Sequence, residues 1–315
     1  MGSDRKTRQF EKRMAQVLDI RPTRVAEVFQ GARPTSLRVN RLLDDQRYAE
    51  TVEQLRQRAP SVTEVDWCEH GWFWPDQDGF DPVMELAHAG RVYAQNAASL
   101  IPPVALDPQP GDAVLDVAAA PGGKAFHLAA RTGNQGRLWL NDSAPPRARK
   151  LAELAELYGV RYAELTTHNA QYIDKELPPE SFDRVLLDVQ CSGEGRVNLR
   201  RPDALRHWSE ERLNKYKFLQ TKMLSCGYKL LRPGGTMVYS TCTLSPEENE
   251  FPVNKVLGRY PDLTVEPLGF QEPEFLPGLT SWMGERYDRR LAHTTRVMPS
   301  ELFEGFYVAR LVKAG

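Results

Sequence analysis

The chain has 315 residues, of which 41 are Lys or Arg and 42 are Asp or Glu, so its formal net charge is −1. Apolar residues make up 41% and charged residues 26%, a composition that excludes a disordered, collagen-like or coiled-coil chain. No apolar run approaches the ~18–20 residues of a membrane span, and the start MGSDRKTRQFEKR lacks the apolar segment of a secretory signal. The length predicts two domains, or one large domain with an appendage.

The cysteines favour a reducing compartment. Cys68, Cys191, Cys226 and Cys242 form no C-x-x-C pair, so we expect no metal site and no disulfide framework. We therefore expect a cytoplasmic protein that acts as a monomer, without membrane contact. Cys68 and Cys226 fit the usual environment of a free cysteine, which is a small buried side chain.

The near-neutral total hides a charge asymmetry. Residues 1–41 carry a net charge of +6 and the remainder carries −7. This bias suggests that the N-terminal region contacts a polyanion, although a solvated helix face would give the same pattern. The ten basic side chains involved are Arg5, Lys6, Arg8, Lys12, Arg13, Arg21, Arg24, Arg33, Arg38 and Arg41.

Residues 1–95 are predicted to form a small α+β module with a linker. Apolar periodicity predicts helices over 4–19, 22–30 and 46–58, and strands over 36–40 and 62–67. Residues 90–106 are expected to form a helix that leads into the second domain. Trp67, Trp72, Phe73 and Trp74 form an aromatic cluster, which could stack bases but more often packs a domain seam.

The second domain is predicted to span residues 96–315. Strand-like runs at 113–117, 137–141, 162–166, 182–188 and 236–240 alternate with helical stretches at 123–131, 144–158 and 209–231. This alternation is typical of an α/β fold with a parallel sheet that has helices on both faces. Its binding crevice is expected at the carboxyl ends of the strands. A last apolar run covers 305–311.

A loop of small residues follows the first of these strands. Its sequence, AAAPGGK over 118–124, lets backbone N–H groups and a helix N-terminus approach a ligand closely. The spacing fits neither G-x-G-x-x-G nor the G-x-x-x-x-G-K-[ST] phosphate loop. Asp142 ends the next strand, where a doubly wound fold places a carboxylate on ribose hydroxyls, and Asp116 could face the same crevice. The sequence therefore predicts a bound nucleoside.

Two cysteines follow the ends of later strands. Cys191 lies in DVQCSGEG after the strand at 182–188, and Cys242 lies in STCT before a helix start expected at 245–248. The carboxyl ends of parallel strands meet at one edge of the sheet, so both thiols should lie beside Asp188 and the nucleoside. A helix N-terminus and nearby cations favour the thiolate, which is the nucleophilic form.

The motifs AAAPGGKA, DVQCSGEG, STCTLSPEENE and EGFYVARL resemble those of the Nop/Nol/Sun family of RNA cytosine-C5 methyltransferases. The stretches TSLRVN and RVYAQNAASLIPP resemble the family's N-terminal signature and linker. The resemblance implies a Rossmann-like class I methyltransferase sheet, preceded by an N-terminal RNA-binding module. It also implies S-adenosylmethionine as cofactor and tRNA or rRNA as partner.

The resemblance further implies roles for individual residues. Cys242 would add to C6 of cytosine, and Cys191 would assist release of the product. Asp188 would hydrogen-bond the N3/N4 edge of the base, and Lys124 would point to the same base. Contacts to S-adenosylmethionine would come from Ala118, Ala119, Ala120, Pro121, Gly122, Gly123, Lys124, Asp142, Arg147, Asn169 and Asp188.

Two positions depart from the family's pattern, and two other functions stay open. Gln190 stands where Pro is usual, and Ala118 stands where Cys is frequent. A DNA cytosine-C5 methyltransferase would use the Asp-x-x-Cys cysteine, Cys191, as nucleophile. A catalytically silent RNA-binding or ribosome-assembly factor would keep only the fold. Residues 196–207 carry four arginines against Asp203 and are expected to contact RNA backbone, the alternative being a solvated surface.

Overall fold

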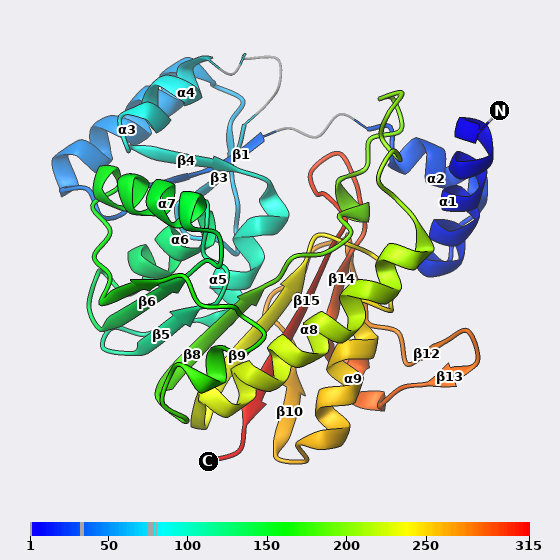
Figure 1. Ribbon diagram of the computed structural model, residues 1–315. Helices are drawn as coiled ribbons and strands as arrows, with labels where there is room; N and C mark the ends of the chain where they lie inside the picture. The colour runs from blue at the N-terminus through cyan, green and yellow to red at the C-terminus, as the bar shows by residue number, and fades with distance from the viewer. Residues whose placement is uncertain (1, 32–34, 75–78, 80) are drawn as a thin grey trace.

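The computed structural model describes residues 2–31, 35–74, 79 and 81–315, so Arg33 of the N-terminal basic set lies outside the described residues. A small antiparallel sheet has the strand order β2-β3-β1-β4 and carries helices α3 (Asp45–Arg58) and α4 (Asp81–His88) (Figure 1). Its core contains Leu37, Val39, Trp72 and Trp74. The strands are β1 (Thr35–Val39), β2 (Thr63–Glu64), β3 (Gly71–Trp74) and β4 (Val92–Gln95).

The large sheet has the order β11-β14-β15-β9-β8-β5-β6-β7, and β10 also pairs with β15. The pairings among β5 to β9 are parallel, as the sequence predicts. The last apolar run forms β15, which pairs antiparallel with β9, so the sheet is mixed. The strands are β5 (Ala113–Asp116), β6 (Arg137–Asn141), β7 (Glu164–Thr166), β8 (Phe182–Asp188), β9 (Leu231–Thr241), β10 (Leu263–Glu266), β11 (Phe275–Pro277), β14 (Thr295–Val297) and β15 (Phe306–Lys313).

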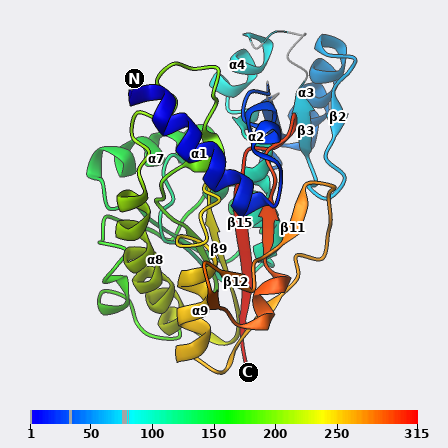
Figure 2. The ribbon, with the colours of Figure 1, turned by 90° about the vertical axis from the view of Figure 1, so that its right-hand side faces the viewer.

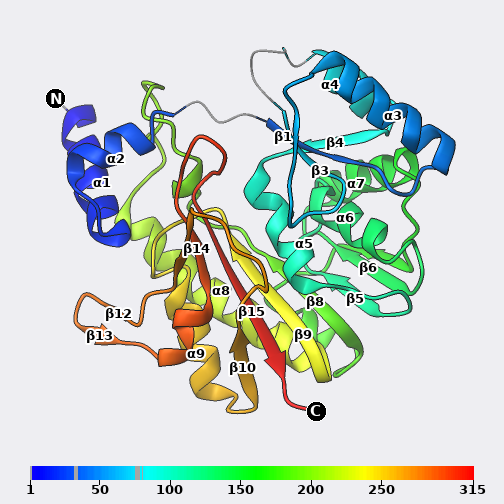
Figure 3. The same ribbon diagram turned by 180° about the vertical axis from the view of Figure 1, so that it is seen from behind.

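Helices cover both faces of the large sheet. One core joins the sheet to α8 (Glu210–Leu230) and α9 (Glu250–Arg259), which lie in front in Figure 1. A second core joins it to α5 (Ile101–Leu106), α6 (Gly123–Arg131) and α7 (Pro145–Leu157), of which α5 lies toward the viewer in Figure 3. The Rossmann-like α/β prediction is therefore confirmed. A separate hairpin of β12 (Ser281–Trp282) and β13 (Glu285–Arg286) lies outside the large sheet.

The first two helices pack on the large-sheet unit and not on the small sheet. Helices α1 (Gly2–Leu18) and α2 (Pro22–Val28) lie apart from α3 and α4 (Figures 1 and 2). They share a core with Val197, Leu205, Trp208 and Leu244. The Phe10 ring meets the Trp208 ring edge-on, with centroids 5.5 Å apart. The N-terminal helix thus lies beside the segment that follows Cys191.

Three predicted elements differ from the structure. The helix expected over 90–106 is wrong: β4 pairs with β1, a 3₁₀ turn covers Ala97–Leu100, and Pro102 and Pro103 open α5, because proline suits only a first helical turn. The strand expected at 62–67 covers only Thr63–Glu64. The helix expected to start at 245–248 begins at Glu250, because Asn249 is bonded to the strand end and its φ and ψ are not helical.

The aromatic cluster packs the seam between the two sheets. Trp67 stacks on Phe270 with ring centroids 4.9 Å apart, and Phe73 meets Phe303 edge-on at 6.0 Å. Trp72 and Trp74 are buried inside the small module. Packing at the seam for Trp67 and Phe73, and in the core of the small module for Trp72 and Trp74, accounts for these rings without base stacking. Within the described residues, no helix is both long and apolar enough to cross a bilayer.

Candidate active site

A cavity of about 440 Å³ lies at the carboxyl ends of β5, β8 and β9, where the sequence places a binding crevice. It extends from the small-residue loop to one of the two cysteines. Its lining combines carboxylates, cations and a thiol with apolar side chains. The lining residues are Tyr93, Ala94, Gln95, Asn96, Ser99, Asp116, Ala118, Ala119, Ala120, Pro121, Gly123, Lys124, Asp188, Val189, Arg196, Cys242, Glu304 and Phe306.

Two glycines let the loop after β5 pass close to its neighbours. Gly122 has a φ of +122°, and a Cβ there would lie 2.4 Å from the Phe126 ring. A Cβ on Gly123 would lie 2.8 Å from both Gln95 and Tyr93. Only glycine fits these positions, which bring the first turn of α6 against β4 and the cavity. The predicted loop residues therefore line the cavity, with the exception of Gly122.

Asp142, Arg147 and Asn169 lie beyond the lining of this cavity. Asp142 follows β6 and is 2% exposed; its Oδ1 accepts a hydrogen bond from the Ala144 N–H. Its Oδ2 has no hydrogen-bond partner and lies 3.4 Å from Nη2 of Arg147, which also donates to the Ala120 carbonyl. Asn169 is exposed and its Oδ1 accepts from the Gln171 N–H. The structure thus brings Asp142 and Arg147 to the 118–120 loop, while Asn169 lies outside the cavity lining.

A lysine and an aspartate form an ion pair inside the cavity. Nζ of Lys124 lies 2.7 Å from Oδ2 of Asp188 and 5.7 Å from the centre of the Phe306 ring. Oδ1 of Asp188 accepts a hydrogen bond from Ser240. The neighbouring Asp116 is fully buried, and burial raises its pKa to about 7 even though the Ala118 N–H donates to it. These groups can present both a donor and acceptors to a planar polar ligand.

The two cysteines meet beside this ion pair. Sγ of Cys191 lies 3.2 Å from Sγ of Cys242, and Cys242 is the one that lines the cavity. The hydrogen bond from Cys191 lowers the pKa of Cys242, despite its burial, and Arg196 and Lys124 act in the same direction. The same contact, together with burial, raises the pKa of Cys191 well above its usual value. The pair therefore favours a thiolate on Cys242 and a thiol on Cys191.

Several site residues escaped the sequence analysis. Arg196 was assigned to RNA backbone yet also lines the cavity, and Phe306 had no predicted role. Glu194 and Glu248 are completely buried behind the cysteine loops, although both lie within the motifs DVQCSGEG and STCTLSPEENE. Burial raises the pKa of Glu248 to about 7. In the sequence, the signal for this pair was a glutamate within each motif that follows a strand. Carboxylates are seldom fully buried unless they are paired.

Comparison with known families decides the relationship. The model of the family described as 16S rRNA methyltransferase RsmB/F matches residues 103–312, which include the whole cavity loop and both cysteines. The chain belongs to the RsmB/F family. A ribosomal RNA small subunit methyltransferase F from Klebsiella pneumoniae strain 342 is 39% identical over 261 residues, which cover 80% of this chain and 52% of that protein. This member of the RsmB/F family thus spans about half the length of the curated relatives it matches.

Solved structures extend the likeness to the whole fold. A methyltransferase homologue from Pyrococcus horikoshii superposes with a TM-score of 0.79 and 31% identity, covering 93% of this chain and 90% of its own. NSun6 from the same organism superposes with a TM-score of 0.76 and 19% identity, covering 98% of each chain. The second likeness concerns the fold alone. Both support a class I methyltransferase architecture for this RsmB/F chain.

Proposed function

We propose that this chain transfers a methyl group from S-adenosylmethionine to C5 of a cytosine in RNA, and that small-subunit ribosomal RNA is its substrate class. The observation that carries the proposal is the Cys191–Cys242 pair, 3.2 Å apart, beside the Lys124–Asp188 ion pair. Membership of the RsmB/F family supports methyl transfer, and the name of the curated relatives favours ribosomal RNA over tRNA.

The residues of the 118–124 loop suit the cofactor. Oδ2 of Asp142 is buried and accepts no hydrogen bond, as expected for a carboxylate that binds ribose hydroxyls. Arg147 lies beside it and can bind a carboxylate or a ribose oxygen. Asn169 follows β7, and we assign its side-chain oxygen to the adenine amino group, as the family resemblance implies. When bound, S-adenosylmethionine supplies an electrophilic methyl group.

The side chains of the cavity supply the remaining chemistry. The Cys242 thiolate adds to C6 of cytosine, which places electron density on C5 so that C5 can attack the methyl group. Asp188 hydrogen-bonds the N3/N4 edge of the base, and Lys124 stabilises the negative charge that builds up in the ring. Transfer of the C5 proton to solvent water then re-forms the C5–C6 double bond and expels the Cys242 thiolate. Cys191, as the protonated partner, donates its S–H to the departing thiolate.

Two basic segments that are far apart in sequence form one surface beside the cysteine loops. Nζ of Lys6 on α1 donates to the Arg206 carbonyl at 3.1 Å, and a second cavity of about 400 Å³ lies between α1 and residues 199–206. We assign the RNA backbone to this surface because clustered exposed cations bind phosphates. Its exposed members are Arg5, Arg8, Lys12, Arg196, Arg200, Arg201 and Arg206, with Lys6 half-buried among them.

Arg13 does not belong to this surface. We expected it among the residues that contact RNA, but its side chain is 9% exposed and is ion-paired with Glu247. The proposed chemistry requires reduced thiols, and all four cysteines are free. This requirement supports action in the cytoplasm, and we propose a monomer because the chain itself supplies both thiols and the basic surface.

Methyl transfer from labelled S-adenosylmethionine tests the proposal. Small ribosomal subunits and tRNA, each from cells that lack the corresponding methyltransferase, are offered separately, and the modified base is mapped. We expect 5-methylcytosine at a defined position of the small-subunit RNA, and none with Cys242→Ala. Label in tRNA alone would move the substrate to tRNA. Absence of label from both, with cofactor bound, would favour the silent RNA-binding alternative.

A further inference from the structure

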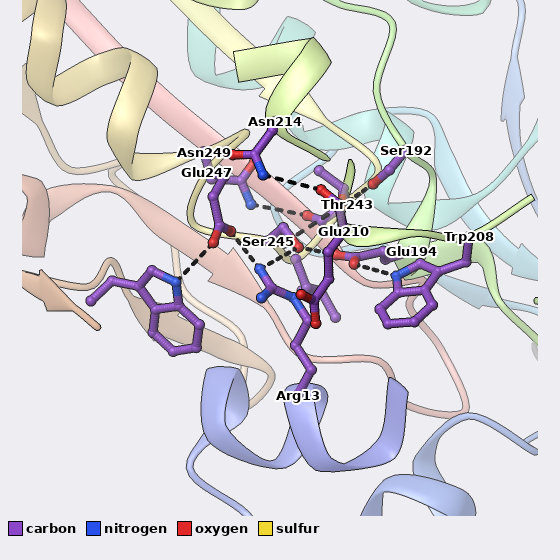
Figure 4. Close-up of polar contacts among 12 residues, drawn as sticks. Arg13, Ser192, Glu194, Trp208, Glu210, Asn214, Thr243, Ser245, Glu247 and Asn249 are labelled. Atoms are coloured by element: carbon purple, nitrogen blue, oxygen red, sulfur yellow. Dashed lines mark hydrogen bonds and ion pairs between the residues drawn. The ribbon is translucent and has the colours of Figure 1, made fainter. Parts of the chain in front are cut away.

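A buried polar network joins the N-terminal helix to both cysteine loops. The Glu194 carboxylate, 0% exposed, accepts hydrogen bonds from the Trp208 indole at 2.7 Å, from Thr243 at 2.9 Å and from Ser245 at 2.6 Å. Nη2 of Arg13 donates to the same Ser245 hydroxyl at 3.2 Å. Figure 4 shows the Arg13 side chain rising from α1 into this group.

The network crosses directly between the two loops that carry the thiols. The Gly195 N–H donates to the Cys242 carbonyl at 3.1 Å, and the Ser192 and Thr243 hydroxyls lie 2.8 Å apart. A Cβ on Gly195 would lie 1.8 Å from the Gly305 carbonyl oxygen. The backbone at Gly195 is therefore packed closely against Gly305, and the Cys191 loop tolerates little displacement there. Residues on either side of Cys191 and Cys242 are therefore held in one register. That register is what places the two sulfur atoms within hydrogen-bond distance.

Arg13 brings a positive charge to this group and is ion-paired there with Glu247. Its guanidinium lies 2.5 Å from Glu247 and 5.6 Å from the centre of the Trp282 ring, and the Trp282 indole also donates to Glu247. Among the described residues, Glu194 makes no ion pair of its own, so Ser245 is its link to the Arg13 cation. A buried carboxylate without such compensation would be costly. Helix α1 thus supplies, through Arg13, the cation of the polar network that lies behind the two cysteine loops.

We propose that Arg13 and Glu194 are positioning residues, and that docking of α1 through them sets the relative placement of Cys242 and Cys191. The inference rests on the proposed function, since it assigns those two thiols to the reaction. It extends that function because it couples the helix that carries the basic surface to the reacting groups. Neither Arg13 nor Glu194 touches the substrate.

The test compares Arg13→Met and Glu194→Gln with the parent protein. The first readout is the alkylation of each cysteine by iodoacetamide as a function of pH, resolved by peptide mass spectrometry without RNA or cofactor. We expect the Cys242 profile to shift to higher pH, because the hydrogen bond from Cys191 is loosened. Cys191, Asp188, Arg196 and Lys124 face Cys242 in the parent and are unchanged in both variants.

The second readout is the single-turnover rate of methylation. Misplacement of a reacting group by about 1 Å can cost ~100-fold, so a fall of roughly 10-fold or more is expected, with unchanged affinity for RNA. Arg13→Lys keeps the cation and should recover most of the rate. Ser245→Ala removes the bridging hydroxyl without burying an unpaired charge, and should give a smaller shift in the same direction.

Arg184→Met is the matched structural control. Arg184 is likewise an ion-paired arginine, half-buried and hydrogen-bonded to Asp112 and Thr236, but it lies at the end of β8 opposite to the cysteine loops. It should lower the melting temperature and leave the Cys242 profile unchanged. If folded Arg13→Met, Glu194→Gln and Ser245→Ala behave like this control, the positioning role is overturned. The iodoacetamide readout tests the positioning role even if the parent protein methylates no RNA. Absence of methylation by the parent would refute the proposed function separately.

Discussion

Sγ of Cys191 lies 3.2 Å from Sγ of Cys242, within hydrogen-bond distance, although 51 positions separate the two residues. The contact makes the thiols unequal, because it lowers the pKa of Cys242 and raises that of Cys191. A nucleophile must be a thiolate, whereas a group that assists a departing thiolate must still hold its proton. The geometry therefore favours Cys242 as the nucleophile.

Alanine variants separate the two roles. Cys242→Ala should abolish both turnover and any covalent protein–RNA complex. Cys191→Ala should still form the complex and transfer the methyl group, but release product slowly, so that the complex accumulates and survives denaturing electrophoresis. The cysteine arrangement of a DNA-type enzyme predicts the reverse pattern. Adduct formation by Cys242→Ala together with an inert Cys191→Ala would overturn the assignment, even with RNA as substrate.

The sequence predicted the large sheet well because its strands are short apolar runs separated by long amphipathic helices. The bounds 137–141, 182–188 and 123–131 match β6, β8 and α6. Errors arose where a distant partner decides the conformation. Residues 92–95 form a strand only because β1 lies beside them, and α9 begins late because Asn249 is bonded to Thr241 and Thr243.

The candidate site was predictable wherever a motif ends a parallel strand. Asp188, Cys191 and Cys242 follow β8 and β9, and the topology alone brings them to one edge. The role of Arg13 was not predictable, because an arginine on a basic helix reads as solvent-facing. Only the packing of α1 against residues 197–208 turns its side chain inward.

Asp142→Ala should weaken the binding of S-adenosylmethionine. The buried carboxylate offers ribose an oxygen that accepts no hydrogen bond within the protein, and its loss would leave the hydroxyls unpaired, at a cost of roughly 1–3 kcal/mol. Titration calorimetry with the full chain measures the change. Asp45→Ala, which removes an exposed carboxylate on α3 that is ion-paired with Arg41, serves as the control. Equal affinities in the two variants would remove Asp142 from the cofactor site.

Neutralising the outer face of α1 should weaken RNA binding. Replacing Arg5, Lys6, Arg8 and Lys12 by Gln, with Arg13 kept, should lower affinity and flatten its salt dependence, since each phosphate contact adds about 0.7–0.9 to the slope. Affinity for the cofactor and the alkylation profile of Cys242 should stay the same.

A matched variant keeps that comparison independent of net charge. Arg137, Arg149, Lys150 and Arg161 are also exposed, but they lie around β6 and α7, away from the basic surface. Replacing these four removes the same charge and should change RNA binding much less. If both sets reduce the salt slope equally, the N-terminal basic residues form only a solvated face.

Asp116→Asn should change how stability depends on pH. Burial raises the pKa of Asp116 to about 7 in the folded protein, whereas in an unfolded chain it titrates near ~3.9. The folded state therefore holds this proton more tightly, and the free energy of unfolding falls as pH rises from about 4 to about 7. Asparagine keeps the acceptor for the Ala118 N–H and carries no charge. The variant should thus gain about 2 kcal/mol relative to the parent between pH 5 and pH 8, measured by urea unfolding without cofactor.

Glu248, with its pKa also raised to about 7, contributes the same trend to both proteins and cancels in the difference. A difference in unfolding free energy that stays constant across this range would show that the pKa of Asp116 is not raised in the folded protein.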